Sequence, residues 1–394
     1  MELSCYACGS TATLDDGTRC ECGAGYWLDT DPSGFHWPES DERSLWRYAD
    51  LLPQVEPAAL CAAAGGTPLM RAPRLDEDLD CRVHLKYEGS NPTGTFKDRG
   101  SAVGVAAAAH RGAEAVATVS HGNMARSMAA HAASIGLECL VFVPESIPEG
   151  RLGLIARHAP SIFQVRGPYD ALYDLSLDVA RDHNLAVVNG DSPLRVAGQK
   201  TTTLEILERF APDVPDAIVL PVSSGGHGSG AWKAVRECRA AGLFRDGPEL
   251  YFIQAEPCAP IAEAWARGDD SVTAIDGGET IAYSIANANP PSGDRILAAA
   301  RDTGGGVLAV SDNAILAARR DLAAEAGVFV ESSCATTLAG ARELAARGAL
   351  GEADDVVLVP TGLGYTERTL DEPTVEPQTV DMADLGSAVA DYLA

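Results

Sequence analysis

Lys97 is the residue whose surroundings point most directly to chemistry. It follows the turn-rich segment YEGSNPTGTF (87–96) and lies in the first turn of a helix predicted over 97–110. Free backbone amides and the positive dipole end at a helix start lower the pKa of a lysine and favour an anionic neighbour. A lysine that is neutral part of the time can attack an aldehyde. The alternative is a solvated lysine beside Asp98 and Arg99.

Four cysteines near the N-terminus have the spacing of a metal site. Two residues separate Cys5 from Cys8 and one residue separates Cys20 from Cys22, so four thiols lie within 18 residues. Four thiolates on two turns match a structural, tetrahedral zinc site, which stabilises its surroundings and does not catalyse. Free cysteines in an appendage without metal are the alternative. The other six cysteines are scattered, and we expect them to be buried thiols.

Two further segments could hold an anion at the start of a helix. SHGNMA (120–125) and PVSSGGHGSG (221–230) each follow an apolar run and precede a helical segment. Glycines let backbone N–H groups converge on an anion without steric obstruction. The second segment lacks the Gly-Lys-Ser/Thr ending of a nucleotide P-loop and the spacing of a dinucleotide fingerprint. For Ser120 and Asn123, an ordinary helix cap is the alternative.

Strands and helices that alternate from about residue 50 must position these loops. Apolar runs predict strands within 113–123, 137–145, 185–191, 216–226, 250–256 and 355–364. Amphipathic segments predict helices over 97–110, 123–135, 170–182, 228–241, 312–326 and 335–347. Such alternation is typical of an open, parallel α/β sheet, in which ligands bind beyond the C-terminal ends of the strands.

The acidic composition excludes some partners. With 30 Lys+Arg against 56 Asp+Glu, the formal charge of −26 repels nucleic acid and anionic membranes, so we expect neither as a partner. Only four of the basic residues are lysines, and this scarcity beside abundant acid resembles proteins of salt-loving organisms. No apolar stretch is long enough to span a bilayer, and the N-terminus lacks a basic region followed by an apolar run, so we expect a cytoplasmic protein.

The segment SNPTGTFKDRG (90–100) resembles the cofactor-lysine motif of threonine synthases and their fold-type II relatives, which use pyridoxal 5'-phosphate (PLP). The resemblance extends over roughly residues 50–370. It implies two open parallel-sheet α/β domains with the cofactor in the cleft between them and bound as a Schiff base on Lys97. The implied large domain comprises 50–104 and 196–394, the small domain comprises 105–195, and 1–45 form a Cys-rich, zinc-ribbon-like appendage. Dimers are usual for this fold, so the resemblance also implies a homodimer.

The same resemblance assigns the other cofactor residues. Asn123 would bond the phenolic oxygen of PLP, and Thr361 in VVLVPTGLG (356–364) would face its pyridine nitrogen. A hydroxyl at that nitrogen favours elimination and replacement over transamination. The phosphate cradle would consist of Ser223, Ser224, Gly225, Gly226 and His227. In threonine synthases this cradle usually reads Gly-Asn-Ala-Gly-Asn, so Ser224 and His227 replace both asparagines.

For the substrate, an amino acid, the resemblance implies that Ser120 binds the carboxylate, while Arg195 and Lys200 in LRVAGQKTTTLEI (194–206) bind a phosphate. Threonine synthases convert O-phosphohomoserine and water to threonine and phosphate. A serine/threonine dehydratase, or another β-eliminating or β-replacing enzyme, would share all the cofactor residues and is the first alternative. A non-catalytic paralogue is the second. The lysine that often follows the glycines of the threonine synthase C-terminal motif is missing after Gly364.

Overall fold

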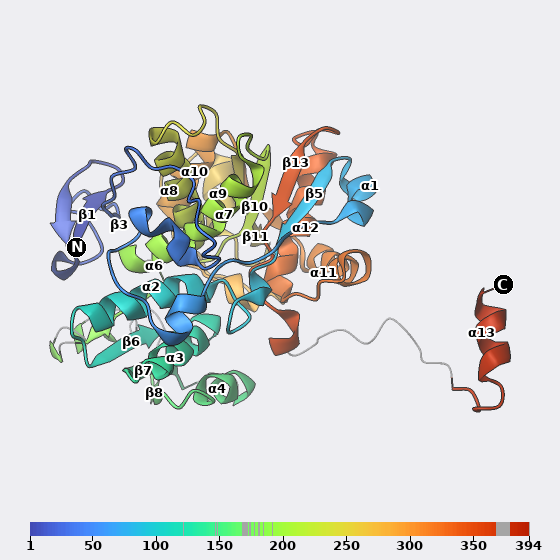
Figure 1. The fold of residues 1–394 in the computed structure, drawn as a ribbon, viewed down its shortest axis with the longest axis horizontal. Coiled ribbons are helices and arrows are strands. Elements are labelled where there is room, and N and C mark those ends of the chain that lie inside the picture. Colours follow the sequence, from blue (N-terminus) through green and yellow to red (C-terminus); the bar gives the residue numbers. More distant parts are fainter. Residues whose placement is uncertain are drawn as a thin grey trace.

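The computed structural model describes residues 1–120, 122–145, 147, 149–167, 172, 175–176, 178–179, 182–183, 185–190, 192–367 and 379–393. Two sheets of parallel α/β type and a small N-terminal sheet make up the fold (Figure 1). Most of the predicted helix over 170–182 lies outside the described residues.

The larger sheet has six strands in the order β12-β11-β10-β13-β5-β4. Its members are β4 (Leu69–Arg71), β5 (Arg82–Lys86), β10 (Ala217–Pro221), β11 (Glu249–Ala255), β12 (Gly306–Val310) and β13 (Asp355–Leu358). All neighbours are parallel except β4, which pairs antiparallel with β5 at one edge. Both faces are buried, which explains why these strands read as apolar runs without alternation.

Helices cover both faces of this sheet. On one face, Val219 and Ile253 pack in a core with α1 (Asp76–Leu79), α11 (Asp312–Ala326) and α12 (Ser332–Ala346). On the other face, Ile218 and Phe252 pack in a second core with helices that include α8 (Gly226–Ala240), α9 (Pro260–Arg267) and α10 (Gly293–Thr303). The sheet therefore forms the middle layer of three.

The smaller sheet has four parallel strands in the order β8-β7-β6-β9. They are β6 (Ala115–Val119), β7 (Glu138–Pro144), β8 (Ser161–Val165) and β9 (Ala186–Val187). The core of this sheet contains residues of α2 (Lys97–His110), α3 (Asn123–Ser134), α4 (Glu149–Ala156) and α6 (Pro193–Gln199). The next helix, α7 (Thr201–Phe210), packs against α8 on the side of the larger sheet. All four strands fall inside the range predicted for the small domain, while the domain limits themselves stay a prediction.

The N-terminal segment forms a three-stranded antiparallel sheet, the ribbon, from β1 (Glu2–Cys5), β2 (Thr11–Thr13) and β3 (Tyr26–Leu28). Its strands have only three or four residues each. Leu3 and Leu28 pack in a core shared with α2 and α3, whereas Trp27 packs in the core of α8. Successive residues of β3 thus face two different cores, because side chains alternate along a strand.

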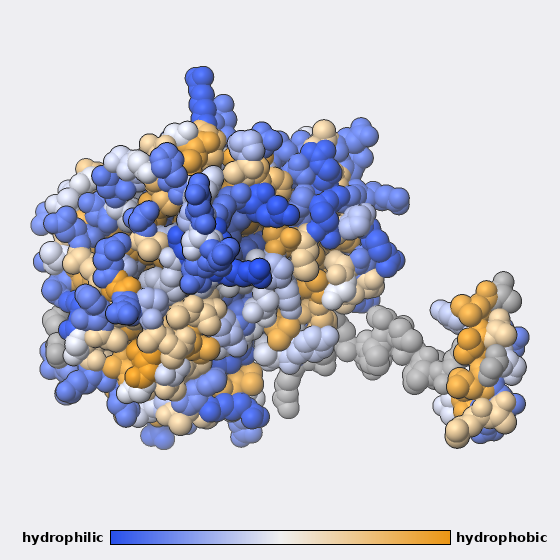
Figure 2. Space-filling view, in the orientation of Figure 1, coloured by the Kyte–Doolittle hydropathy of each residue, from blue (hydrophilic) through white to orange (hydrophobic). Residues whose placement is uncertain are grey.

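The last helix, α13 (Leu385–Leu393), stands apart from the rest of the molecule (Figure 1). Figure 2 shows hydrophilic residues over much of the visible face and apolar residues along α13. Within the described part of the chain, no helix is both long and apolar enough to cross a membrane.

Candidate active site

Lys97 begins α2, as the sequence predicted, and its loop is bound to the end of β13. Phe96 donates its amide to the Thr361 carbonyl at 2.9 Å, and Leu363 donates to the Gly94 carbonyl at 2.9 Å. Gly94 has φ of 78°, in the left-handed region that favours glycine. These backbone bonds bring Lys97 and Thr361, which lie more than 260 residues apart in sequence, to the same end of the sheet.

The environment of the Lys97 amine suits a nucleophile. Burial and then the positive charge of Arg195 lower its pKa to about 7, whereas Glu331 acts in the opposite direction. Lys97 Nζ lies 4.4 Å from the centre of the Phe96 ring. A lysine with a pKa of about 7 is substantially neutral at physiological pH, so its amine can attack a carbonyl.

The Gly-rich segment after β10 forms the first turn of α8. Gly225 has φ of 89°, and a Cβ on it would lie 2.7 Å from the Ser292 carbonyl oxygen. A Cβ on Gly226 would lie 2.5 Å from the Gly190 carbonyl oxygen. Both positions therefore require glycine. The first amides of an α-helix have no carbonyl of their own helix to bind, so this turn offers donors to an anion.

His227, which replaces an asparagine of the usual cradle, closes this turn against the lysine loop. Its ring stacks on Phe96 with centroids 4.3 Å apart and an interplanar angle of 25°. Burial and then the charge of Lys97 lower its pKa to about 3, so the ring is neutral. Both ring nitrogens are buried and have no hydrogen-bond partner among the described residues. A buried polar group that has no hydrogen-bond partner in the protein indicates a place for a ligand.

Asn123 is the first residue of α3, which follows the end of β6. Its side chain binds Glu331, the residue that precedes α12. Its side-chain amide donates to both carboxylate oxygens of Glu331, at 2.7 and 2.9 Å. Burial raises the pKa of Glu331, although the bond from Asn123 opposes this. Glu331 was not among the site residues predicted from the sequence. An acidic residue in an otherwise apolar stretch, VFVESS (328–333), was the available signal that it has a role at the site.

Thr361 and Ser120 occupy equivalent places in the two sheets, just beyond a strand. The Thr361 hydroxyl lies 3.2 Å from the sulfur of Cys334, in a buried position. Ser120 directly follows β6, and its hydroxyl accepts a bond from the Gly122 amide at 3.3 Å. The contact of Thr361 with the pyridine nitrogen of PLP and the contact of Ser120 with the substrate carboxylate stay predictions.

The structure brings Arg195 to Lys97. One terminal nitrogen of Arg195 donates to the Lys97 carbonyl at 3.3 Å, and the other donates to Ser101 Oγ at 3.0 Å. The side chain is fully buried, and burial lowers its pKa to about 10. The charge of the buried Asp98 carboxylate opposes this shift, and among the described residues the Nε of Arg195 has no hydrogen-bond partner.

Lys200, by contrast, does not have the environment that was predicted for it. Its side chain is completely buried, and Nζ donates to Glu237 Oε1 at 2.8 Å. Lys233 lies 2.8 Å from the same carboxylate. The assignment of Lys200 as a phosphate ligand stays a prediction, and this ion pair argues against it, because the charge of Lys200 already neutralises a buried glutamate in α8. Lys200 and Arg195 lie close in sequence, but their side chains point to different parts of the core.

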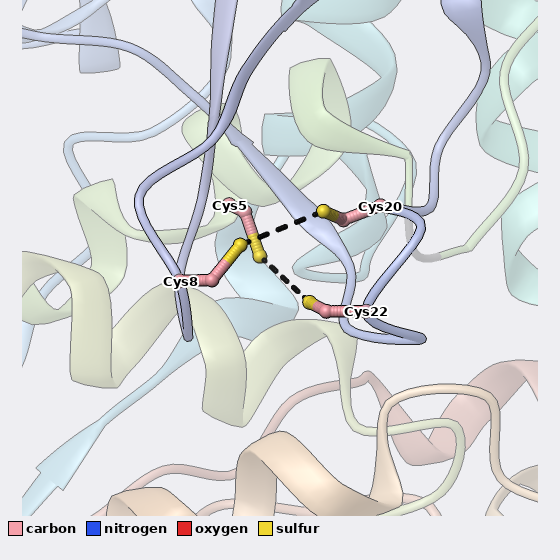
Figure 3. A group of neighbouring side chains, drawn as sticks. All are labelled: Cys5, Cys8, Cys20 and Cys22. Atoms are coloured by element: carbon pink, nitrogen blue, oxygen red, sulfur yellow. Dashed lines mark hydrogen bonds between the residues drawn. The ribbon is translucent and has the colours of Figure 1, made fainter.

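The four N-terminal cysteines meet at one point (Figure 3). All four sulfurs lie within 4.8 Å of one another, and the pairs Cys5–Cys22 and Cys8–Cys20 are each 3.6 Å apart. Two are buried and two are exposed. The donor set and its closeness fit one tetrahedral metal ion.

Comparison with known proteins identifies the family. A family model described as pyridoxal-phosphate dependent enzyme matches residues 60–362. The chain belongs to this family. It is 33% identical over 388 residues to the threonine synthase of Methanocaldococcus jannaschii, covering 95% of this chain and 96% of that protein. It is also 36% identical over 341 residues to the threonine synthase of Methanosarcina acetivorans, with 86% and 84% covered.

Solved structures agree on the fold of this PLP-dependent enzyme. Maize serine racemase superposes with a TM-score of 0.67 at 23% identity, covering 83% of this chain and 92% of that one. Threonine deaminase isoform 2 from Solanum lycopersicum also has a TM-score of 0.67, at 19% identity, covering 92% and 91%. At such low identity the likeness shows the fold alone. The predicted fold-type II class, family and PLP cofactor are confirmed.

The residues of the site fit PLP. The free amides at the start of α8 suit its phosphate, and the unpartnered nitrogens of His227 lie beside them. The near-neutral amine of Lys97 suits its aldehyde. The individual contacts of Asn123, Thr361 and the cradle with the cofactor stay predictions.

The pH dependence of cofactor attachment follows from the pKa of Lys97. Only the neutral amine attacks an aldehyde, so the rate should be constant above pH about 7 and fall about tenfold per pH unit below it. Replacing Arg195 by methionine removes a positive neighbour, so the midpoint should shift to higher pH. The rate of appearance of the visible imine band after PLP is added to the apoprotein measures this. A midpoint near about 10.4, the value of an unperturbed lysine, would contradict it.

Proposed function

We propose that this protein is a threonine synthase, which converts O-phosphohomoserine and water to threonine and phosphate. The supporting observation is Arg195, a fully buried guanidinium that touches Lys97 and has no carboxylate partner among the described residues. The buried Asp98 acts on this cation through its charge, and a substrate phosphate would give it a directly bound anion. The sequence similarity to threonine synthases supports the same conclusion.

In this reaction the chain's own residues position the substrate and move protons. PLP supplies a ring that stabilises negative charge on the substrate carbons. Ser120 and the first amides of α3 hold the substrate carboxylate, and Arg195 holds the phosphate that leaves from Cγ. The Lys97 amine removes protons from Cα and Cβ, and it returns one to Cγ, which becomes the methyl group of threonine, and one to Cα; a pKa of about 7 lets it act as base and as acid at neutral pH. Water then adds at Cβ.

The contact between Glu331 and Asn123 helps to hold Asn123 in place beside the cofactor. Glu331 accepts two bonds from the Asn123 amide, which fixes the direction in which that amide points. Glu331 is itself held by the Thr366 hydroxyl at 3.4 Å. We infer that Glu331 positions Asn123 and does not itself contact the substrate.

The N-terminal cysteines bind one zinc ion in this proposal. The grounds are the four sulfurs within 4.8 Å of one another and the small size of the ribbon, whose short strands bury little apolar surface. Metal analysis of purified protein should give one zinc per chain. A stoichiometry well below one, in protein prepared without chelator, would contradict it.

A substrate comparison tests the proposed activity. Purified protein should release inorganic phosphate from O-phosphohomoserine, and should form far less 2-ketobutyrate from threonine. An excess of ketoacid over phosphate would instead indicate a dehydratase. The assay should include high salt, because the charge of −26 makes the folded chain self-repelling at low ionic strength.

Arg195→Met should separate substrate binding from cofactor binding. Loss of a charge-assisted bond to phosphate should raise KM for O-phosphohomoserine by about tenfold or more. PLP should still attach to Lys97 in this variant at high pH. An unchanged KM would remove Arg195 from the phosphate site.

A further inference from the structure

The ribbon binds the helix that carries the phosphate cradle. Trp27 in β3 donates its indole N–H to the hydroxyl of Ser229 in α8, at 2.8 Å in a buried position. Arg295 in α10 donates to the same hydroxyl oxygen at 3.2 Å and to the Tyr26 carbonyl at 3.4 Å. The Trp27 ring also packs edge-on against Trp232, with centroids 5.2 Å apart. The contact thus joins β3 directly to the first two turns of α8.

Ser229 is only one turn from the cradle. Its amide donates to the Gly225 carbonyl at 2.8 Å, which is the first backbone bond of α8. The side chain and the backbone of Ser229 therefore connect Trp27 to the glycine whose left-handed conformation starts the cradle. A shift of Ser229 would change the direction of the first-turn amides on which anion binding depends.

A second route reaches the cradle from the ribbon's metal-binding turn. Arg19, next to Cys20, donates to the Pro291 carbonyl at 2.5 Å. The following residue, Ser292, donates its amide to the Ser224 carbonyl at 2.9 Å. Ser224 belongs to the cradle. The segment 291–292 therefore connects the turn that carries Cys20 to the residue that precedes Gly225.

The cysteine cluster lies beside the segment that makes these contacts. The turn that carries Cys20 and Cys22 leads directly into β3, whose first residue is Tyr26. Gly25 lies so close to Arg295 that a Cβ there would overlap the guanidinium, so the turn must keep one path past α10. With strands of three or four residues, the ribbon has too small a core to hold this path by packing alone.

We propose that the metal-folded ribbon sets the affinity of the enzyme for PLP, with Trp27 as the positioning residue that holds the start of α8. This inference rests on the proposed zinc site and is independent of the amino-acid substrate. Loss of the metal releases β3, which withdraws the Trp27 N–H from Ser229 and frees the first turn of α8. The cradle amides then spread over several orientations, and the phosphate of PLP binds less tightly.

The experiment measures PLP affinity, without substrate, on the full chain in reducing buffer. Equilibrium dialysis and the visible imine band give the dissociation constant for three proteins: untreated, zinc-depleted, and Trp27→Phe. Phenylalanine keeps an aromatic ring against Trp232 but removes the N–H donor. We expect Trp27→Phe to keep its zinc and to bind PLP about three- to tenfold more weakly. Zinc depletion should weaken binding by at least about tenfold, because both routes are lost.

Trp46→Phe is the matched control. Trp46 also donates its indole N–H at 2.8 Å, but to the Cys61 carbonyl, away from α8. Its PLP affinity should equal that of the unmodified protein, and equal losses in both tryptophan variants would overturn the proposal. An unchanged affinity in Trp27→Phe would also overturn it. If zinc removal unfolds the whole chain by circular dichroism, the Trp27→Phe result alone decides. Absence of threonine synthase activity would leave these binding constants, and the inference, unaffected.

Discussion

Replacing Lys97 by methionine should lower kcat for threonine formation by at least about 10³-fold and remove the visible imine band. Methionine is unbranched and similar in length, so it should leave the loop and the start of α2 in place. The other three lysines cannot substitute, because each is held by a buried carboxylate. Lys86 pairs with Glu205, and Lys200 and Lys233 both pair with Glu237.

Steady-state kinetics and absorbance spectra of the variant measure both effects. Lys97→Arg is the companion variant, since it keeps a positive charge but cannot form an imine under these conditions. Both variants should still bind PLP non-covalently through the cradle, and equilibrium dialysis can detect this. Turnover within tenfold of the unmodified enzyme in Lys97→Met would show that the amine is not the catalytic group.

Replacing Arg99 by methionine should lower the free energy of unfolding by about 3–5 kcal/mol. Arg99 is fully buried and donates two bonds to Glu88, at 2.6 and 2.8 Å, and two to Glu205, at 2.6 and 2.8 Å. Glu88 is itself completely buried. Without the guanidinium its carboxylate remains in the core with no cation, and this uncompensated charge causes most of the loss.

Denaturant unfolding at constant salt measures this change. The double variant Arg99→Met/Glu88→Gln should be less destabilised than the sum of the two single variants, because removing both charges leaves none unpaired. Arg111→Met, at the other end of α2, is the control. Arg111 pairs with Asp15 at the surface, where water solvates both charges, so this change should have a far smaller effect. Equal losses in the two arginine variants would contradict the explanation.

The sequence predicted much of the scaffold, because local signals marked its elements. The helix predicted over 97–110 is α2, that over 312–326 is α11, and that over 123–135 differs from α3 by one residue. The helix α11 has the expected cap, since the Ser311 side chain accepts from the Ala314 amide, and α3 directly follows Gly122. The strands β5, β8 and β12 were not predicted. In β5 and β8, RVHLK and SIFQV, polar residues interrupt the apolar pattern, and so short a run does not distinguish a strand from the end of a helix.

Charged residues of the site were predicted less well. Arg99 and Asp98 could be read from sequence as solvated neighbours of Lys97, yet both are fully buried. Lys200 seemed a phosphate ligand because it lies near Arg195 in sequence, yet it neutralises Glu237. The partner of a charged side chain is set by which helices pack together. For Lys200 and Glu237 that partner is 37 residues away.

The sequence by itself determined the parts of this protein that depend on local conformation and on residue type. Three features can be recognised without knowledge of the fold. They are the lysine at a helix start, the glycines in a loop where the backbone must approach an anion closely, and the paired cysteines. Only the tertiary structure decided which cations are free to act. Among the described residues Arg195 binds a hydroxyl and a carbonyl while Lys200 binds a carboxylate, and Trp27 reaches Ser229 across 202 residues of chain. Those contacts join residues remote in sequence, and no local pattern encodes them.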